Sequence, residues 1–230
     1  MSLIQDAFKR LHYPTDVIAQ CVRWYLTYSL SLRDLEEMMV ERGILVDHST
    51  IHRWIIRLVP IISKKMAQCK KPVNQFWHID ETYIKIKGQL HYLYRAIDSN
   101  GKTVDLLLTK HRDTKAAQRF FKKAISQHAC PIRVTMDKSG ANKKAIESFN
   151  IGFTRFTPIT IRQNKYLNNR IEQDHRFIKK RVREMLSLET FHTAKIMLAG
   201  IELMHMIHKG QFNLPSEQST SVGSFYQLIG

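Results

Sequence analysis

The apolar residues change their spacing near residue 76, and this change requires two kinds of structure in one chain. Before it, apolar side chains recur every three or four residues, as in Ile51, Trp54, Ile55 and Leu58, which is the period of an amphipathic helix. After it, residues 77–87 are rich in β-branched and aromatic types and alternate along the chain, which is typical of a strand. The pattern predicts a helical first part followed by a mixed α/β centre.

Residues 1–70 are expected to form a helix-turn-helix unit. Helices are predicted at 17–28 and 32–42, and the second is capped by Ser31 and ended by Gly43. A third helix, at about 50–58 after Asp47 or Ser49, turns basic side chains outward and suits the major groove of DNA. An ordinary three-helix bundle with a solvated basic face would show the same pattern. The residues expected to contact DNA from this helix are His48, Ser49, Thr50, His52, Arg53 and Arg57.

Residues 62–75 are polar and basic and include Pro72, so they are predicted to be an exposed linker. Strands are then predicted at 77–87, 90–97, 103–109 and 132–136, with a weak strand near 152–156. Helices are predicted from Asp113 or Thr114 to about 128, and at 142–149. The first of these helices is a crossover, which lays the fourth strand parallel beside the first. The expected class is α/β, with an N-terminal helical unit and then a mixed sheet with flanking helices.

The chain is expected to return to helices after the sheet. One is predicted from Asn168 or Asn169 to about 183, and another, capped by Ser187, at about 190–209. Residues 211–230 are polar and are expected to be a loosely ordered tail. The predicted domains are therefore a helix-turn-helix unit with its linker at 1–70, a catalytic domain at 71–210, and the tail.

The charge of the chain points to a polyanionic partner. There are 36 Lys and Arg against 20 Asp and Glu, a formal net charge of +16. Nucleic acid is the commonest such partner, because each neutralised phosphate releases condensed counterions. The three cysteines form no C-x-x-C pair, which argues against a disulfide framework or a zinc site. No long apolar run or secretory signal is apparent, so a cytoplasmic protein without membrane contact is expected.

Three acidic residues are expected to meet at one end of the sheet. Asp80 lies within the first strand, Asp137 ends the fourth, and Glu172 lies on the helix that follows. Carboxylates so close together repel unless cations lie among them, and hard divalent ions prefer oxygen ligands. Two such ions can activate an attacking oxygen and stabilise a leaving one in phosphoryl transfer. For Glu172 alone, an ordinary surface pair with Arg176 is the simpler interpretation.

Three neighbouring residues are expected to stand outside this cluster. Glu81 should point to the opposite face of the sheet from Asp80, because side chains alternate along a strand. Asp174 is placed near the far side of its helix from Glu172, and His175 is expected at the surface.

The predicted helix that carries Glu172 is strongly basic. Residues 162–183 include eight Lys or Arg and two acids, a net charge of 8 − 2 = +6. Such a run is often a solvated face, but beside a site that cuts DNA a groove that follows the DNA backbone is favoured. The residues expected to contact DNA here are Lys165, Asn169, Arg176, Lys179 and Arg183.

Several motifs together carry a family resemblance. They are HIDETYIK at 78–85, YLYRAID at 92–98, TMDK at 135–138 and KYLNNRIEQDH at 165–175. Thirty-four residues separate Asp137 from Glu172, Lys179 follows seven residues later, and DHSTIHRW at 47–54 fits a helix-turn-helix. Over roughly residues 10–210 the sequence resembles small bacterial DDE-type insertion-sequence transposases, of the ribonuclease H-like integrase superfamily.

The resemblance implies a reaction and its components. Asp80, Asp137 and Glu172 would be the catalytic residues and the ligands of two Mg²⁺ ions, with Mn²⁺ as a substitute and no other cofactor. The enzyme would cut the ends of a mobile element and transfer the 3′-hydroxyl ends into target DNA, giving cointegrates. Its partners would be double-stranded DNA, at the terminal inverted repeats and the target, and further copies of itself, at least a dimer on DNA. The expected location is the bacterial cytoplasm, with the nucleoid.

Two other functions use the same features. A DNA-binding regulator could keep the helix-turn-helix beside an inert catalytic fold, but the presence of all three acids argues against it. A structure-specific nuclease could share the fold, but the helix-turn-helix and the spacing of the acids favour transposition.

Overall fold

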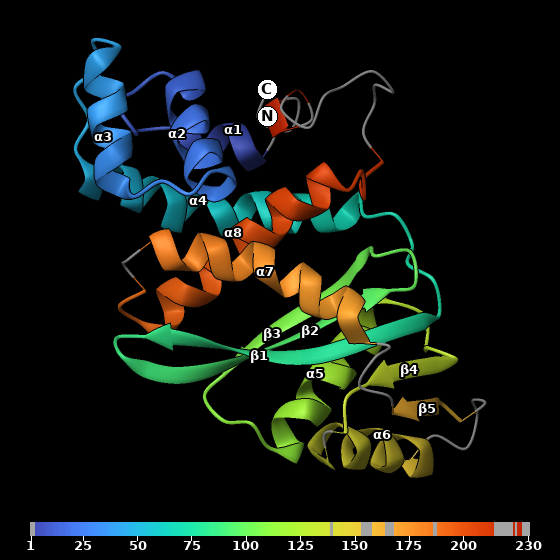
Figure 1. Cartoon of the computed structure of the whole chain (residues 1–230). Helices are drawn as coiled ribbons and strands as arrows, with labels where there is room; N and C mark the ends of the chain where they lie inside the picture. Colours follow the sequence, from blue (N-terminus) through green and yellow to red (C-terminus); the bar gives the residue numbers. More distant parts are fainter. Residues whose placement is uncertain are drawn as a thin grey trace. The chain divides into compact units, whose positions relative to one another are not determined.

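A computed structural model describes residues 3–138, 140–152, 158–163, 168–185, 188–213, 223 and 225–226. The chain forms two compact units, one of residues Pro72–Phe177 and one of Met1–Lys71 with Ile178–Gly230. Figure 1 shows the elements, coloured along the sequence. In chain order they are α1 (Leu3–Phe8), α2 (Thr15–Thr27), α3 (Leu32–Glu41), α4 (His48–Gln68), β1 (Phe76–Ile86), β2 (Gln89–Asp98), β3 (Thr103–Thr109), α5 (Thr114–Gln127), β4 (Arg133–Met136), α6 (Gly140–Gly152), β5 (Thr160–Gln163), α7 (Asn169–Glu184) and α8 (Phe191–His208). The predicted α/β class, a helical first part and then a mixed sheet with flanking helices, is confirmed.

The sheet has five strands in the order β3-β2-β1-β4-β5. β1 is antiparallel to β2 and parallel to β4, as the predicted crossover requires. The pairing of β1 with β4 is short and runs only from Phe76–Arg133 to His78–Thr135. A weak strand is predicted near 152–156, of which only Gly152, the last residue of α6, is described; the fifth strand of the sheet is Thr160–Gln163. Residues 153–157 lie outside the described part of the chain.

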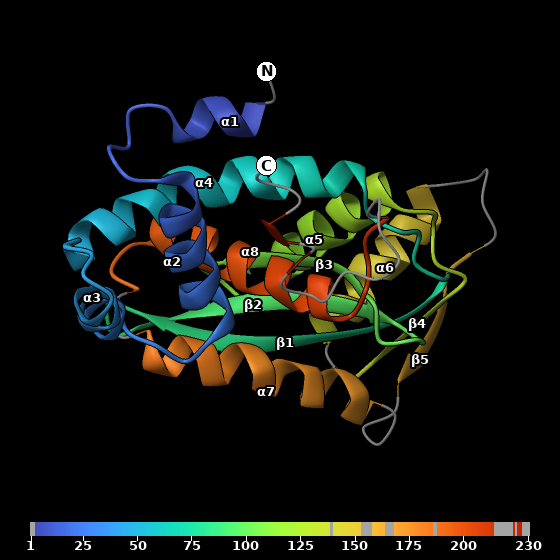
Figure 2. The ribbon, with the colours of Figure 1, turned by 90° about the horizontal axis from the view of Figure 1, so that it is seen from above.

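The two faces of the sheet differ in what covers them. On one face, Trp77 and Ile79 of β1 and Tyr94 of β2 form a core with Phe120 of α5. On the other face, Arg95 of β2 contacts the first half of α7. Figure 2 shows α5 on one side of the strands and the first half of α7 on the other. Alternation along β1 and β2 therefore assigns each side chain to the α5 face or the α7 face.

The N-terminal helices follow their predicted caps, with one large difference in length. The Ser31 hydroxyl accepts from the Asp34 backbone N–H in a capping box that begins α3, and Gly43 beyond its end has a φ of 74°. A residue there needs a left-handed backbone, which glycine adopts without steric cost. α4 runs on to Gln68 through much of the predicted linker, because Ile62 and Met66 continue its buried stripe. The exposed connection is correspondingly shorter than predicted.

The C-terminal elements also depart from the prediction in detail. α8 is capped by Thr190, whose hydroxyl accepts from the Thr193 backbone N–H, while Ser187 lies outside the described residues. In the described part of the 211–230 segment, Phe225 is fully buried and the Tyr226 ring lies against the Arg23 guanidinium. Among the helices that the structure describes, none combines the length and apolar character that a membrane span needs. The division into functional domains at 1–70, 71–210 and 211–230 stays a prediction.

Candidate active site

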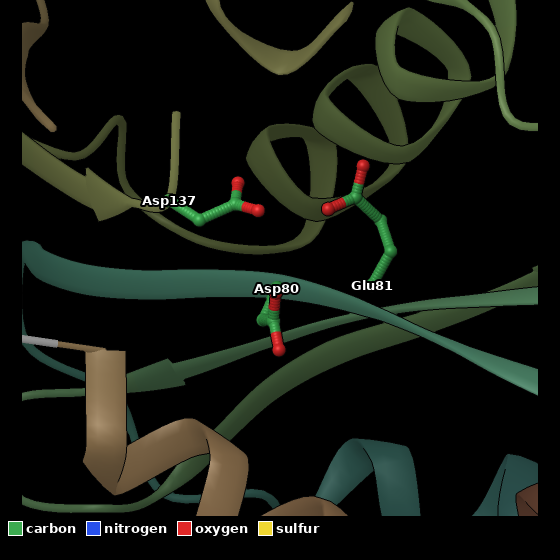
Figure 3. A group of neighbouring side chains, drawn as sticks. All are labelled: Asp80, Glu81 and Asp137. Atoms are coloured by element: carbon green, nitrogen blue, oxygen red, sulfur yellow. The ribbon is translucent and has the colours of Figure 1, made fainter. Parts of the chain in front are cut away.

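The register of β1 and β2 places two acidic residues on opposite faces of the sheet. Asp80 pairs with Arg95 across the strands, and the next residue, Glu81, pairs with Tyr94. Tyr94 faces the core beneath α5 and Arg95 faces α7, so Glu81 lies on the α5 face and Asp80 on the α7 face. Figure 3 shows the two carboxylates on opposite sides of the β1 ribbon.

Asp137 completes a group of three carboxyl groups. It follows the last residue of β4, and its carboxylate points toward that of Glu81 (Figure 3). One oxygen from each of Asp80, Glu81 and Asp137 lies within 4.8 Å of the others, close enough for a metal ion to be shared. The parallel pairing of β1 with β4 ends at His78 and Thr135, so Asp80 and Asp137 each lie two residues beyond it.

Arg112 supplies the positive charge in this group. Its Nε lies 3.4 Å from Glu81 Oε1, and its Nη2 lies 4.0 Å from Asp137 Oδ2. Burial raises the pKa of Glu81 above its ordinary value; the Arg112 charge opposes this shift, and the Asp137 and Asp80 charges add to it. The nearby Glu81 charge in turn raises the pKa of Arg112. Only 2% of the Glu81 side chain is exposed, against 40% for Asp137, so Asp137 is the more accessible carboxylate.

The prediction for Glu81 is right about the face of the sheet on which it lies, but wrong in placing it outside the acidic group. Alternation does place it opposite Asp80, but the Asp137 carboxylate points to the Glu81 side of β1. A sequence signal was available, because Trp77, Ile79 and Glu81 share one alternation and the first two are clearly core residues. Alternation does not predict the direction of the Asp137 side chain, because Asp137 comes after the last paired residue of its strand.

The first turns of α7 lie beside β1 on the Asp80 side. The Asn168 side-chain amide donates to the Ile79 carbonyl at 3.3 Å, and His175 Nδ1 lies 3.3 Å from Asp80 Oδ2. Glu172 lies four residues after Asn168 and three before His175, at the edge of the same helix face. Its side chain is exposed, and the structure does not bring it into the group formed by Asp80, Glu81 and Asp137.

The expectations for Asp174 and His175 differ in outcome. Asp174 does lie on the side of the helix away from Glu172, where its Oδ2 is 2.7 Å from Nη2 of the buried Arg95. His175 is not a surface residue, because it is buried against Asp80. The buried stripe of the helix runs through Ile171 and His175, so Glu172 and Asp174 flank it on its two sides.

Residues 74–211, a stretch that contains Asp80, Asp137 and Glu172, match the model of a family described as a DDE domain, of the IS240 transposase type. The chain belongs to the DDE transposase family.

Two proteins similar to this DDE transposase come from Staphylococcus aureus. The chain is 42% identical over 202 residues to the transposase of the insertion sequence-like element IS431mec from strain Mu50, a match that covers 88% of each protein. It is equally similar, over the same share, to the transposase of IS257 in transposon Tn4003. A solved structure of the HTLV-2 integrase catalytic core domain in complex with magnesium is 18% identical, with a TM-score of 0.45, over 67% of this chain and 97% of that one.

The helix-turn-helix candidates of this transposase lie at the start of α4 and are mostly exposed. Asp47 caps the helix by accepting from the backbone N–H groups of Ser49 and Thr50. His48 Nδ1 lies 2.8 Å from Glu36, and Arg53 donates to the Thr50 hydroxyl. Arg57 donates to the Lys9 carbonyl, and His52 is half-buried. DNA contact by these residues stays a prediction.

The α7 candidates share an exposed position. Asn169, Arg176, Lys179 and Arg183 are all exposed, which a surface that binds the DNA backbone requires. Lys165 lies outside the described residues. The exposure of these four side chains agrees with a solvated basic helix equally well, so their role in DNA binding also stays a prediction.

Proposed function

We propose that this DDE transposase cuts the ends of an insertion sequence and transfers the freed 3′-hydroxyl ends into target DNA, giving cointegrates. The observation that carries the proposal is the family match, which spans residues 74–211 and includes the three acids of the sequence motif. The similarity to insertion-sequence transposases over 88% of the chain supports the same activity for the whole protein.

The acidic group fits divalent metal ions. Carboxylate oxygens within 4.8 Å of one another are the donor set that hard cations such as Mg²⁺ and Mn²⁺ prefer, and without a cation their charges repel. In the proposal Asp80 and Asp137 hold the ions, and Glu172 completes the set from α7. When bound, two ions would activate the attacking oxygen and stabilise the leaving oxygen of the phosphodiester.

The protein's own side chains prepare the site for DNA. Arg112 lies between Glu81 and Asp137 and is 46% exposed, so it can contact a phosphate that approaches the carboxylates. Glu81 is buried next to Arg112; burial raises the pKa of its carboxyl group, and the Arg112 charge opposes that shift.

Binding to DNA draws on the charge of the whole chain. A net charge of +16 favours association with a polyanion through counterion release. In the proposal α4 recognises the terminal inverted repeats, and the exposed basic residues of α7 follow the DNA backbone. Joining two ends to one target requires at least a dimer on DNA, in the bacterial cytoplasm with the nucleoid.

The test is a strand-transfer assay with the DNA that flanks the gene, Mg²⁺ and a target plasmid. Wild type is expected to form joined products, whereas Asp80→Asn and Glu172→Gln should bind the ends without joining them. Glu81→Gln is the matched control, because it neutralises an acid of the same cluster that the proposal does not make a ligand. Joining by Glu172→Gln but not by Glu81→Gln would assign the third ligand to Glu81 instead.

Two other outcomes would contradict the proposed reaction. Hydrolysis of the ends without joining would indicate a nuclease. Specific binding without cleavage by wild type would indicate a regulator on a catalytic fold. Mobility shift with the same DNA measures binding separately from chemistry in every variant.

A further inference from the structure

His175 is a buried side chain in contact with Asp80 from the side opposite Glu81. Its Nδ1 lies 3.3 Å from Asp80 Oδ2, and only 5% of its side chain is exposed. The Asp80 side chain is itself 15% exposed, so the two polar groups meet largely out of solvent. A largely buried polar contact of this kind constrains both partners, because little water reaches either group.

The chain leading to His175 is held to the sheet at two further points. Before it, the Asn168 amide donates to the carbonyl of Ile79, the residue preceding Asp80. Next to it, Asp174 forms a 2.7 Å ion pair with Arg95, which is the cross-strand partner of Asp80. The backbone around His175 is therefore held in register with the backbone around Asp80.

We propose that His175 is a positioning residue that orients Asp80 for metal binding. In this role Nδ1, which lies 3.3 Å from Asp80 Oδ2, would carry a proton toward that oxygen and hold the Asp80 side chain in a single rotamer, so that the other oxygen stays available to an ion. This inference rests on the proposed function, in which Asp80 is a metal ligand. Partners of ligating carboxylates matter because their loss typically weakens metal binding by about 10–100-fold.

The position of His175 in the sequence gives this contact a second effect. His175 lies three residues after Glu172, about one turn further along the same helix. The contact with Asp80 therefore ties the strand that bears the first acid to the helix that bears the proposed third acid. Reorientation of Asp80 and displacement of Glu172 are expected to occur together when the contact is lost.

The alternative role for a buried histidine is packing, and the choice of variants separates the two roles. Leucine fills a similar volume but donates no hydrogen bond, so His175→Leu keeps the packing and removes the polar contact. The asparagine amide reaches the position of Nδ1, so His175→Asn restores the donor. Gln173 is exposed on the same helix, and Gln173→Leu is the matched control for the introduction of a leucine.

The experiment measures Mn²⁺ binding to the full chain without DNA, by calorimetry or by electron paramagnetic resonance. We expect His175→Leu to bind Mn²⁺ at least tenfold more weakly than wild type. His175→Asn and Gln173→Leu should remain within about threefold of wild type, with thermal unfolding recorded in parallel. Wild-type affinity in His175→Leu would overturn the inference, as would an equal loss in His175→Leu and His175→Asn.

Two further measurements keep the result decisive. If His175→Leu does not fold, His175→Gln replaces it. The glutamine amide reaches the position of Nε2 rather than that of Nδ1, so this variant also lacks the donor. Equal Mn²⁺ affinities in His175→Gln and His175→Asn would then overturn the inference. Asp80→Asn tests the underlying site. Normal Mn²⁺ binding by Asp80→Asn would contradict the proposed metal site itself. Loss of Mn²⁺ binding in Asp80→Asn, together with normal binding in His175→Leu, would contradict only the role of His175.

Discussion

The ion pair between Arg95 and Asp174 allows a quantitative test of how the first half of α7 is held to the sheet. The Arg95 side chain is fully buried, that of Asp174 is 14% exposed, and their closest atoms are 2.7 Å apart. Removing one partner of a buried pair costs about 3–5 kcal/mol, because the other charge stays buried without it. Since Asp174 reaches solvent in part, we expect Asp174→Ala to cost about 3 kcal/mol, near the lower end of that range. In a chain of this size that corresponds to a fall in Tm of about 6–12 °C.

The two single substitutions should not be equivalent. Arg95→Met leaves the partly exposed Asp174 carboxylate, which water can solvate, so a cost of about 2 kcal/mol is expected. The double variant Arg95→Met/Asp174→Leu removes both charges and should lie near wild type, because well-packed apolar residues replace buried ion pairs at little cost. The double-mutant cycle therefore predicts strong coupling between the two positions.

Urea unfolding, followed by circular dichroism and by tryptophan fluorescence, measures these free energies, and the buried Trp77 reports on the sheet. Lys143→Ala is the control, because it breaks the exposed i, i+4 pair with Glu147 and should cost less than about 0.5 kcal/mol. If Asp174→Ala unfolds within about 0.5 kcal/mol of wild type, or if the two substitutions are additive, the pair does not hold the helix in the way argued above.

Three other predictions concern separate parts of the chain. Arg53→Ala should weaken binding to the element ends by about tenfold at moderate salt, as expected for a lost arginine contact, and unchanged fluorescence anisotropy titrations would remove α4 from recognition. Gly200→Val should lower stability by about 1–3 kcal/mol, because an added Cβ would lie 2.7 Å from Leu26 Cδ2; an unchanged Tm would contradict this. Burial raises the pKa of Cys21 to about 11 from an ordinary 9.0, so the unfolded thiol ionises first and stability should fall as pH rises between these values. Cys21→Ala should show a smaller loss than wild type in urea unfolding at pH 8 and pH 10, and equal losses would exclude this contribution.

Local chemistry determined the elements that could be predicted from the sequence. Ser31 and Asp113 cap helices where their side-chain oxygens were expected to, and the strands of the meander agree with the prediction to within about two residues, the usual uncertainty of an element boundary. The crossover rule then placed the fourth strand beside the first. The predicted helix is shorter than α4, because the lysines and Pro72 indicate an exposed linker. The buried stripe nevertheless continues through Ile62 and Met66.

The surroundings of the candidate site depended on tertiary contacts that a linear pattern does not contain. Asp174 was placed by its angle from Glu172, but the relevant reference is the buried stripe through Ile171 and His175, which becomes known only when the helix meets the sheet. Glu81 and Arg112 are far apart in sequence, and their contact depends on the connection between β3 and α5. The pattern of acids predicts the kind of chemistry, whereas the residues that surround those acids depend on how the elements pack together.

The short pairing between β1 and β4 limits where insertions and deletions can survive in chains of this kind. An extra residue between His78 and Asp80 would exchange the faces of Asp80 and Glu81, because a shift of one position in a strand reverses every side chain after it. Beyond Thr135 no β1 partner fixes the register of β4, so a length change after α6 would leave the Asp80–Asp137 geometry intact. A change of length within β1 should therefore disrupt the acidic group, whereas one between α6 and β5 should leave Asp80 and Asp137 in place.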